Sequence, residues 1–323
     1  GWFGHVIDTV AVLATLFGLA TSLGFGAQQA ASGLHFLFDI PNTINVQIAI
    51  ICGVTAVAVF SVVRGLDGGV KVLSQINMAM AALLLAFVFV VGPTGTIVGN
   101  ILDTGASYIT TIVPLSNWIG REDEKFFHGW TVFYWAWWIS WSPFVGMFIA
   151  RVSRGRTVRQ FIVAVLLVPT LVTLVWMAVF GGSALYQVEA DMGELADGLE
   201  DVSLAMFQML DNLPLASVTS FVAICLVLVF FVTSSDSGSL VIDSITAGGK
   251  IDVPVVQRIF WAVIEGVVAG VLLFGGGVDA LGALQAAAIC VGLPFTVILL
   301  AMCLSLYLGL RHELASERAA AAG

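Results

Sequence analysis

The sequence predicts an all-α, polytopic helical membrane protein with about eight transmembrane helices, and two observations carry this prediction. The chain of 323 residues is 59% hydrophobic and only 10% charged, whereas soluble domains contain about 25% charged residues. Its apolar residues gather in stretches close to 20 residues long, roughly the length that a helix needs to cross a bilayer. A water-soluble fold is therefore not expected.

The apolar stretches define eight expected spans. Helices are expected because a backbone in hydrocarbon must satisfy its hydrogen bonds internally. The first and last spans are long enough to tilt in the bilayer. The spans cover residues 6–34, 43–63, 72–94, 128–150, 160–181, 215–234, 255–275 and 280–310.

Three connections have a character of their own. Residues 97–126 are too polar to span, but they place apolar side chains at helical intervals, which predicts an amphipathic helix at the outer interface. Residues 182–214 are acidic and contain no Lys or Arg, which favours the outer side. Residues 235–254 are polar and rich in Gly and Ser, which predicts a cytoplasmic re-entrant stretch or short helix. Residues 311–323 form a short cytoplasmic tail.

The basic residues predict the orientation of the spans. With eight alternating spans, only Arg121 and Lys125 fall on one side, and the other ten basic residues share the side of both chain ends. Because cytoplasmic connections carry an excess of Lys and Arg, both ends are expected in the cytoplasm. The ten residues are Arg64, Lys71, Arg151, Arg154, Arg156, Arg159, Lys250, Arg258, Arg311 and Arg318.

Residues 129–159 contain five tryptophans inside one apolar stretch. Such aromatic residues serve either to pack and anchor a helix at the interface or to bind a quaternary ammonium, which gains about 2 kcal/mol or more per desolvated ring. Pro143 is expected to break the helix and to free a carbonyl for a cation, with a plain kink as the alternative. Five aromatic residues at spacings of 4, 3, 4 and 3 share one helical stripe: Trp130, Tyr134, Trp137, Trp141 and Phe144.

Polar side chains elsewhere in the spans are further candidates. Thr233 and Ser234 end a span before an acidic residue, a pattern that suits either oxygen coordination of a hard cation or capping of the helix end. Thr15 and Ser22 share a face of the first span, where hydroxyls usually bond to their own helix. Glu265 lies halfway along an apolar span and is a functional candidate, although we favour a structural polar contact for it.

The sequence gives no support for an enzyme. It contains no phosphate-binding GxxxxGK[ST] motif, no strand-borne GxGxxG motif and no cluster of metal ligands. Its polar residues form no acid–base pair or nucleophile–base constellation. We therefore expect no enzymatic activity, no cofactor and no nucleic-acid partner.

Three stretches resemble the betaine/choline/carnitine transporter family, and the resemblance extends over essentially the whole chain. FYWAWWISWSPFVGMFIARVSRGRTVR is similar almost residue for residue to the signature of this family, and FFVTSSDSG and ATLFGLATSLGFGAQQ also match. The resemblance implies a leucine-transporter-type fold of twelve helices with two inverted five-helix repeats, and this chain would be an N-terminally truncated piece from the fifth helix to the twelfth. Residues 1–96 would hold the last three helices of the first repeat, 97–126 the linker helix and 127–310 the second repeat.

The resemblance also implies a function. The protein would be a secondary active transporter of the plasma membrane that imports a quaternary-ammonium compatible solute by alternating access, coupled to sodium and assembled as a homotrimer. Glycine betaine is the first expectation, with choline and carnitine as alternatives. Two other classes stay open: a carrier or exchanger of similar fold for another amine or amino acid, and a non-transporting membrane sensor or scaffold.

For the solute, the resemblance implies a trimethylammonium site to which Trp138 and Trp141 contribute. Trp135 and Trp137 would flank the pathway that leads to this site. No residue in this set has a catalytic role.

For sodium, the resemblance implies two sites. The carbonyl of Phe144 would bind one ion beside Thr15. Leu19 departs from the family pattern at this site, because sodium-coupled members carry a second threonine there. The first span contains no Arg or Lys, unlike sodium-independent exchangers of the family, which favours coupling through the second site. Half of that site would consist of the Phe230 carbonyl and the hydroxyls of Thr233 and Ser234.

Overall fold

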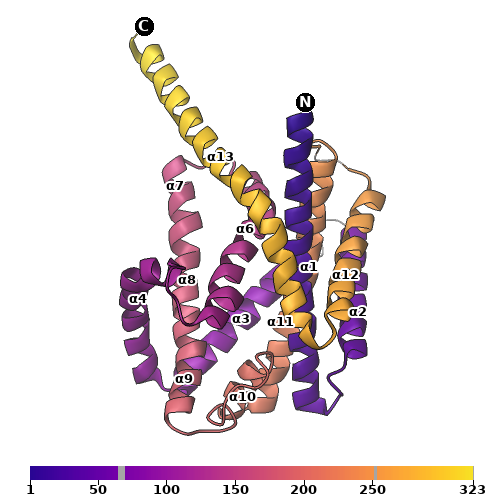
Figure 1. The fold of residues 1–323 in the computed structure, drawn as a ribbon, viewed down its shortest axis with the longest axis vertical. Helices are drawn as coiled ribbons and strands as arrows, with labels where there is room; N and C mark the ends of the chain where they lie inside the picture. The colour runs from indigo at the N-terminus through magenta and orange to yellow at the C-terminus, as the bar shows by residue number, and fades with distance from the viewer. Residues whose placement is uncertain (65–69, 251–252, 323) are drawn as a thin grey trace.

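The computed structural model describes residues 1–64, 70–250 and 253–322, and within them all regular structure is helical (Figure 1). The predicted all-α class is therefore confirmed. The longest helices are α1 (Trp2–Phe38), α2 (Ile44–Arg64), α3 (Val70–Val91), α4 (Thr94–Ser116), α6 (Phe133–Val152), α11 (Ala216–Thr246), α12 (Val255–Gly276) and α13 (Ala280–Ala322). The shorter ones are α5 (Glu124–Phe126), η1 (Phe127–Val132), α7 (Val158–Ile162), η2 (Val163–Leu167), α8 (Val168–Trp176), η3 (Met177–Gly181), α9 (Gly182–Glu189), α10 (Ala205–Asp211) and η4 (Gly277–Asp279).

Seven helices of the described chain are long and apolar enough to cross a membrane. They correspond to seven of the eight predicted spans, and the run from α7 to α9 forms one of them. The eighth prediction, 128–150, is helical through η1 and α6 but is not one of the seven, because its tryptophans, tyrosine and serines make it less apolar. The chain is thus a polytopic helical membrane protein.

Helix α1 lies at the centre of the bundle, where it contacts α2, α6, α11, α12 and α13 (Figure 1). Its buried middle is rich in glycine and alanine, and small residues let membrane helices approach closely. At Gly26 the approach is so close that an added Cβ would lie 1.6 Å from the ring of Phe231 on α11. This contact fixes α11 against α1 beside the tryptophan-bearing α6.

Helix α11 corrects one prediction. The polar stretch 235–254 was expected to leave the span, but α11 continues to Thr246, so the prediction is wrong for residues 235–246. The reason is that Ser235 and Asp236 find hydrogen-bond partners on α12 and α2 inside the bundle. Three parts of the predicted elements lie outside the described residues. They are residues 251–252 of that connection, residues 65–69 between the second and third spans, and residue 323 of the tail.

The amphipathic segment predicted over 97–126 is a helix only in part. Helix α4 ends at Ser116, and a short non-helical stretch precedes the helix that carries the tryptophans. Arg121 in this stretch donates to the Leu115 carbonyl at 2.9 Å, and its guanidinium lies 4.8 Å from the centre of the Phe127 ring. Its hydrogen bond to Asp123 lowers the pKa of that carboxyl. Arg121 thus links the end of α4 to the start of η1.

Candidate functional site

The predicted aromatic stripe is continuous in the structure. Each residue contacts the next, with ring centres 6.0 Å apart for Trp130–Tyr134, 5.7 Å for Tyr134–Trp137, 6.5 Å for Trp137–Trp141 and 5.6 Å for Trp141–Phe144. The helical spacing of the five residues alone produces this continuous row of rings. Its inner half, from Trp137 onward, faces α1.

Two tryptophans of the stripe converge on one backbone atom of α1. The indole nitrogens of Trp137 and Trp141 donate to the carbonyl oxygen of Gly18, at 3.3 and 3.0 Å. The hydroxyl of Ser22 donates to the same oxygen at 3.1 Å. This convergence places a polar junction inside an apolar contact between α1 and α6.

The junction requires a glycine at position 18. A Cβ on Gly18 would lie 2.7 Å from the hydroxyl oxygen of Ser140 and 3.0 Å from Cδ1 of Trp141. The first distance is too short for any real Cβ contact, and Ser140 is fully buried. The absent side chain therefore sets the distance between α1 and α6.

Pro143 lies inside α6, which continues to Val152 without interruption. The prediction that Ser142–Pro143 breaks this span is therefore wrong, and Phe144 does not lie in an unwound stretch. Pro143 has no N–H to give to the carbonyl of Ile139, four residues earlier. The hydroxyl of Ser142 donates to that carbonyl at 2.6 Å. Ser142 thus replaces the hydrogen bond that Pro143 cannot donate.

The structure separates the four predicted solute-site tryptophans onto two faces of α6. Trp137 and Trp141 are partly buried against α1, while the side chains of Trp135 and Trp138 are 58% and 68% exposed. Trp137 is enclosed by other rings, including Phe133 stacked at 5.3 Å and the edge of Phe25 at 5.6 Å. Among the described residues, no ring pairs with that of Trp138, in contrast to Trp137.

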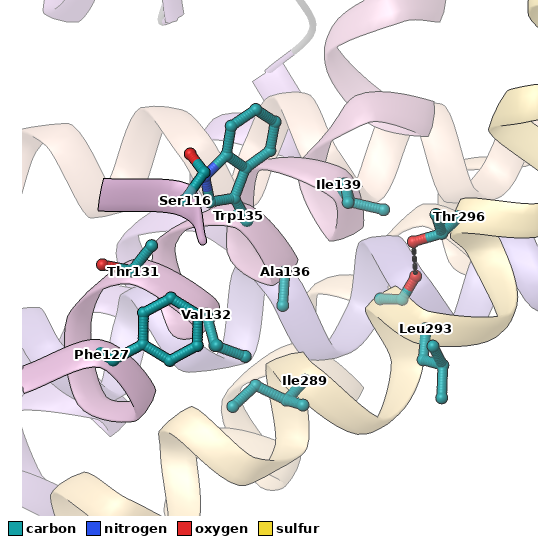
Figure 2. Close-up of a pocket in the computed structure, with 11 residues that line it drawn as sticks. Ser116, Phe127, Thr131, Val132, Trp135, Ala136, Ile139, Ile289, Leu293 and Thr296 are labelled. Carbon is teal, nitrogen blue, oxygen red and sulfur yellow. Dashed lines mark hydrogen bonds between the residues drawn. The ribbon is translucent and has the colours of Figure 1, made fainter. Parts of the chain in front are cut away.

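Trp135 borders a cavity of about 360 Å³ between α6 and α13 (Figure 2). Figure 2 shows its indole at one edge, with Ala136 and Ile139 of α6 and Ile289 of α13 along the wall. The lining is mostly apolar, and the hydroxyl of Thr296 is used by the carbonyl of Gly292. This cavity therefore lies on a different side of α6 from the Gly18 junction.

The two residues predicted for the first sodium site are both buried, on helices that touch. Thr15 of α1 is 1% exposed and Phe144 of α6 is 7% exposed, and α1 contacts α6. The hydroxyl of Thr15 donates to the carbonyl of Ala11 on its own helix. Leu19 packs with Phe144 in an apolar cluster, and Gly238 of α11 touches Leu19 so closely that a Cβ there would lie 2.1 Å from Cδ1 of Leu19.

The three residues predicted for the second sodium site lie together on one turn of α11. The hydroxyl of Thr233 donates to the carbonyl of Phe230 at 2.9 Å, and Ser234 is partly buried beside them. Two of the predicted oxygen ligands are therefore already adjacent. Both lie on α11, which is packed against α1.

Sequence reasoning missed the residues that hold the tryptophans in place. Gly18, Phe25, Phe133 and Ser140 were not singled out, although Gly18 lies inside the ATLFGLATSLGFGAQQ stretch. A glycine among small residues indicates close packing, but it does not indicate which helix approaches. Phe133 lies four residues before Trp137, and this spacing alone would have placed it beside that ring.

The fold and this aromatic junction define the class of protein: a multi-pass helical membrane protein with an aromatic segment at the crossing of two buried helices. The chain belongs to the BCCT, or betaine/carnitine/choline, transporter family, whose model matches residues 1–315. The family is one of transporters rather than enzymes, in agreement with the absence of a catalytic constellation in the sequence.

Three proteins named as glycine betaine transporters are similar to the chain. The chain is 64% identical over 314 residues to glycine betaine transporter 1 of Vibrio parahaemolyticus, covering 97% of this chain and 60% of the relative. It is 62% identical over 319 residues to a glycine betaine/proline/choline/ectoine transporter of the same organism, covering 98% and 57%. It is 43% identical over 316 residues to a glycine betaine transporter of Bacillus subtilis, covering 97% and 61%. The chain thus spans about 60% of the length of these relatives.

Proposed function

We propose that the protein imports a quaternary-ammonium compatible solute, glycine betaine in the first place, across the plasma membrane by sodium-driven alternating access. The observation that carries the proposal is the position of the tryptophan segment at the α1–α6 crossing in a chain of this family. The names of the relatives, which specify glycine betaine, support the choice of solute. We also propose that both chain ends lie in the cytoplasm and that the protein assembles as a homotrimer.

In this proposal Trp138 provides the ring face that attracts the trimethylammonium group. A cation over an indole face gains electrostatic energy, most of all where water is excluded. Trp137 and Trp141 have a different role, since their N–H groups bond to the Gly18 carbonyl. They hold α6 in register with α1, so that Trp138 and Trp135 point in defined directions.

Sodium coupling is proposed through the oxygen atoms of α11. The Phe230 carbonyl and the Thr233 hydroxyl are within hydrogen-bond distance of each other, so one ion could contact both once the hydroxyl proton turns away. Oxygen ligands of this kind suit a hard cation. The first site, Thr15 with Phe144, has weaker support, because the carbonyl of Phe144 lies within a continuous helix and Leu19 supplies no oxygen.

Uptake by proteoliposomes tests the proposal. The full-length protein is reconstituted, and labelled glycine betaine is offered with an inward sodium gradient, with equal sodium on both sides, or with potassium in its place. We expect uptake under the sodium gradient to exceed the uptake measured in potassium, and uptake without a gradient not to exceed it. Binding of both sodium and betaine without any flux would instead show a sensor or scaffold.

A second candidate is a carrier of broader range, because one relative is named for proline and ectoine as well as for glycine betaine and choline. Unlabelled choline, carnitine, proline and ectoine at equal concentrations separate the two possibilities. Competition by trimethylammonium compounds alone supports the proposed solute class. Equal competition by proline favours the broader carrier.

A further inference from the structure

A row of buried polar residues runs between α11 and α12, and no role proposed above uses it. Arg258 of α12 pairs with Asp243 of α11, with Nε and Oδ2 3.7 Å apart, and further along, Ser235 donates to Glu265 at 2.7 Å. These two pairs show that the helices run antiparallel in register. We call the row the polar ladder, consisting of Ser235, Asp236, Ser239, Asp243, Arg258, Trp261 and Glu265.

The polar ladder holds unpartnered groups in the interior of the bundle. Among the described residues, ten buried side-chain nitrogen and oxygen atoms have no hydrogen-bond partner, and five of them lie in the ladder. Glu265 and Asp243 are 1% and 0% exposed. A buried polar group without a partner costs free energy, so native proteins usually satisfy it with an ordered water or a bound species. The five atoms are both Oδ atoms of Asp243, Nε of Arg258, Nε1 of Trp261 and Oε1 of Glu265, and two of them, Arg258 Nε and Asp243 Oδ2, face each other as the ion pair.

The kinds of unpartnered atom indicate water rather than a metal cation along most of the ladder. Arg258 and Trp261 present N–H donors, whereas Asp243 and Glu265 present oxygen acceptors. A cation can satisfy only the acceptors and would repel the donors. A water molecule can satisfy both, because it donates and accepts. Positions 258, 261 and 265 lie on one face of α12, so bridging water is the species that suits both the donors and the acceptors of this row.

At the Glu265 end the chemistry changes, because the ladder's base, Arg258, pairs with Asp243 and not with Glu265. Ser235 and Asp236 are consecutive residues; Ser235 donates to Glu265, and Ser61 of α2 donates to Asp236 at 2.5 Å. Each of the two carboxyl groups thus accepts a hydrogen bond from a serine hydroxyl on a neighbouring helix. The ladder's one base, Arg258, lies about two helical turns away and pairs with Asp243. A carboxylate buried as deeply as that of Glu265 is unfavourable without a base beside it, and a proton removes its charge.

Among the side chains that the structure describes, the helices packed against Glu265 place no base beside it. Helix α12 contacts α1, α2, α11 and α13. Helix α2 contributes Ser61 and, beside Gly266, Thr55, whose hydroxyl has no partner, while Cys52 of α2 is exposed. Cys290 and Cys303 of α13 are exposed too. Tyr307 of α13 is 57% exposed, and the other titratable residues of α1 and α13 lie toward their ends: His5, Asp8, His35, Arg311, His312, Glu313, Glu317 and Arg318.

We propose that Glu265 is a proton-binding site, connected by a file of buried waters along the polar ladder to the aqueous face near Arg258. Arg258 lies within the first turn of α12, which begins at Val255, so this end of the ladder is close to the membrane surface. Glu265 carries this proton and exchanges it with the water of the file. Solute uptake by the intact transporter is then sensitive to the pH on that face.

Infrared difference spectroscopy tests this proposal without any transport. The carbonyl stretch of a protonated carboxylic acid is separate from the amide bands, and it shifts when the proton is replaced by deuterium. The full-length protein in detergent is expected to show such a band at neutral pH, to lose it in Glu265→Gln, and to shift it within minutes of transfer to D2O. Asp236→Asn, the matched control, is expected to retain the band.

Three results would overturn the proposal. A band that survives in Glu265→Gln shows that the proton lies elsewhere, and loss in Asp236→Asn alone assigns it to Asp236. A band that resists exchange in D2O for hours shows that no water reaches Glu265 along the polar ladder.

Trp261→Phe, which removes one donor and keeps an aromatic ring, is expected to slow the exchange several-fold. These measurements need no solute, so their outcome does not depend on whether the protein carries out the proposed transport.

Discussion

The indole nitrogen of Trp141 lies 3.0 Å from the carbonyl oxygen of Gly18 and donates a hydrogen bond to it. This bond joins α6 to α1 at the position where Gly18 lacks a side chain. The junction therefore depends on both an indole donor and the absence of a Cβ. Each requirement can be tested separately.

Gly18→Ala tests the second requirement. The added methyl group would lie 2.7 Å from the Ser140 hydroxyl, and overpacking of a buried contact costs about 1–3 kcal/mol. We expect a lower unfolding temperature for the full-length protein in detergent. Gly146→Ala on α6 is the control, since nothing lies within 4 Å of its added Cβ, and we expect equal or higher stability. Equal stability of Gly18→Ala and wild type would contradict the close approach.

Trp137→Phe and Trp141→Phe test the first requirement, because each removes an N–H donor and keeps a ring. Either indole alone keeps the Gly18 carbonyl bonded to α6, so the double variant is expected to lose more stability than the sum of the single losses. The excess should be about 0.5–1.5 kcal/mol, comparable to one hydrogen bond. Denaturation of all four proteins measures it. Strict additivity would show that the two donors act independently.

Ser142→Ala tests how α6 accommodates Pro143. The substitution leaves the Ile139 carbonyl without its 2.6 Å donor, and an unsatisfied buried carbonyl costs about 1–3 kcal/mol. In a Pro143→Ala background the backbone N–H of residue 143 can serve that carbonyl. We therefore expect Ser142→Ala to be nearly neutral there, as measured by thermal unfolding. A similar loss in both backgrounds would rule out this role for Ser142.

Thr233→Ala tests the proposed sodium ligands on α11. Loss of a hydroxyl that contacts a charged group costs about 1.5–3 kcal/mol, so the sodium concentration for half-maximal uptake should rise roughly tenfold or more. Thr233→Ser is expected to retain the wild-type value. Thr219→Ala on the same helix, where the hydroxyl bonds to Leu215 and Ala216, serves as the control. An unchanged sodium requirement would remove Thr233 from the site.

Much of the fold could be predicted from the sequence, because apolar length determines membrane spans and helical spacing determines the aromatic stripe. Two errors have a common origin. Pro143 was expected to break α6, and residues 235–246 were expected to leave α11. In each case a polar side chain forms a hydrogen bond that keeps the helix intact. Ser142 donates to the Ile139 carbonyl, and Asp236 accepts from the hydroxyl of Ser61, 175 positions away in the chain. Composition does not reveal such partners.

The candidate site shows the same limit. Spacing correctly grouped the stripe from Trp130 to Phe144, but it could not show which tryptophans would be enclosed. Trp137 is surrounded by the rings of Phe25 and Phe133, whereas Trp138, one position later, is exposed. Consecutive residues on a helix point about 100° apart, so the neighbouring helices decide which of the two meets a ligand. Those neighbours are set by small residues such as Gly18.

Betaine binding to Trp138 variants tests the central claim most directly. Equilibrium binding of labelled glycine betaine to the full-length protein is measured in saturating sodium. Trp138→Ala is expected to weaken binding roughly tenfold or more, since the lost ring interaction is worth about 2 kcal/mol, and Trp138→Phe is expected to weaken it less. Trp118→Ala, which changes an exposed tryptophan outside α6, should leave the affinity unchanged. An affinity unaffected by Trp138→Ala would contradict recognition of the solute by the tryptophan segment.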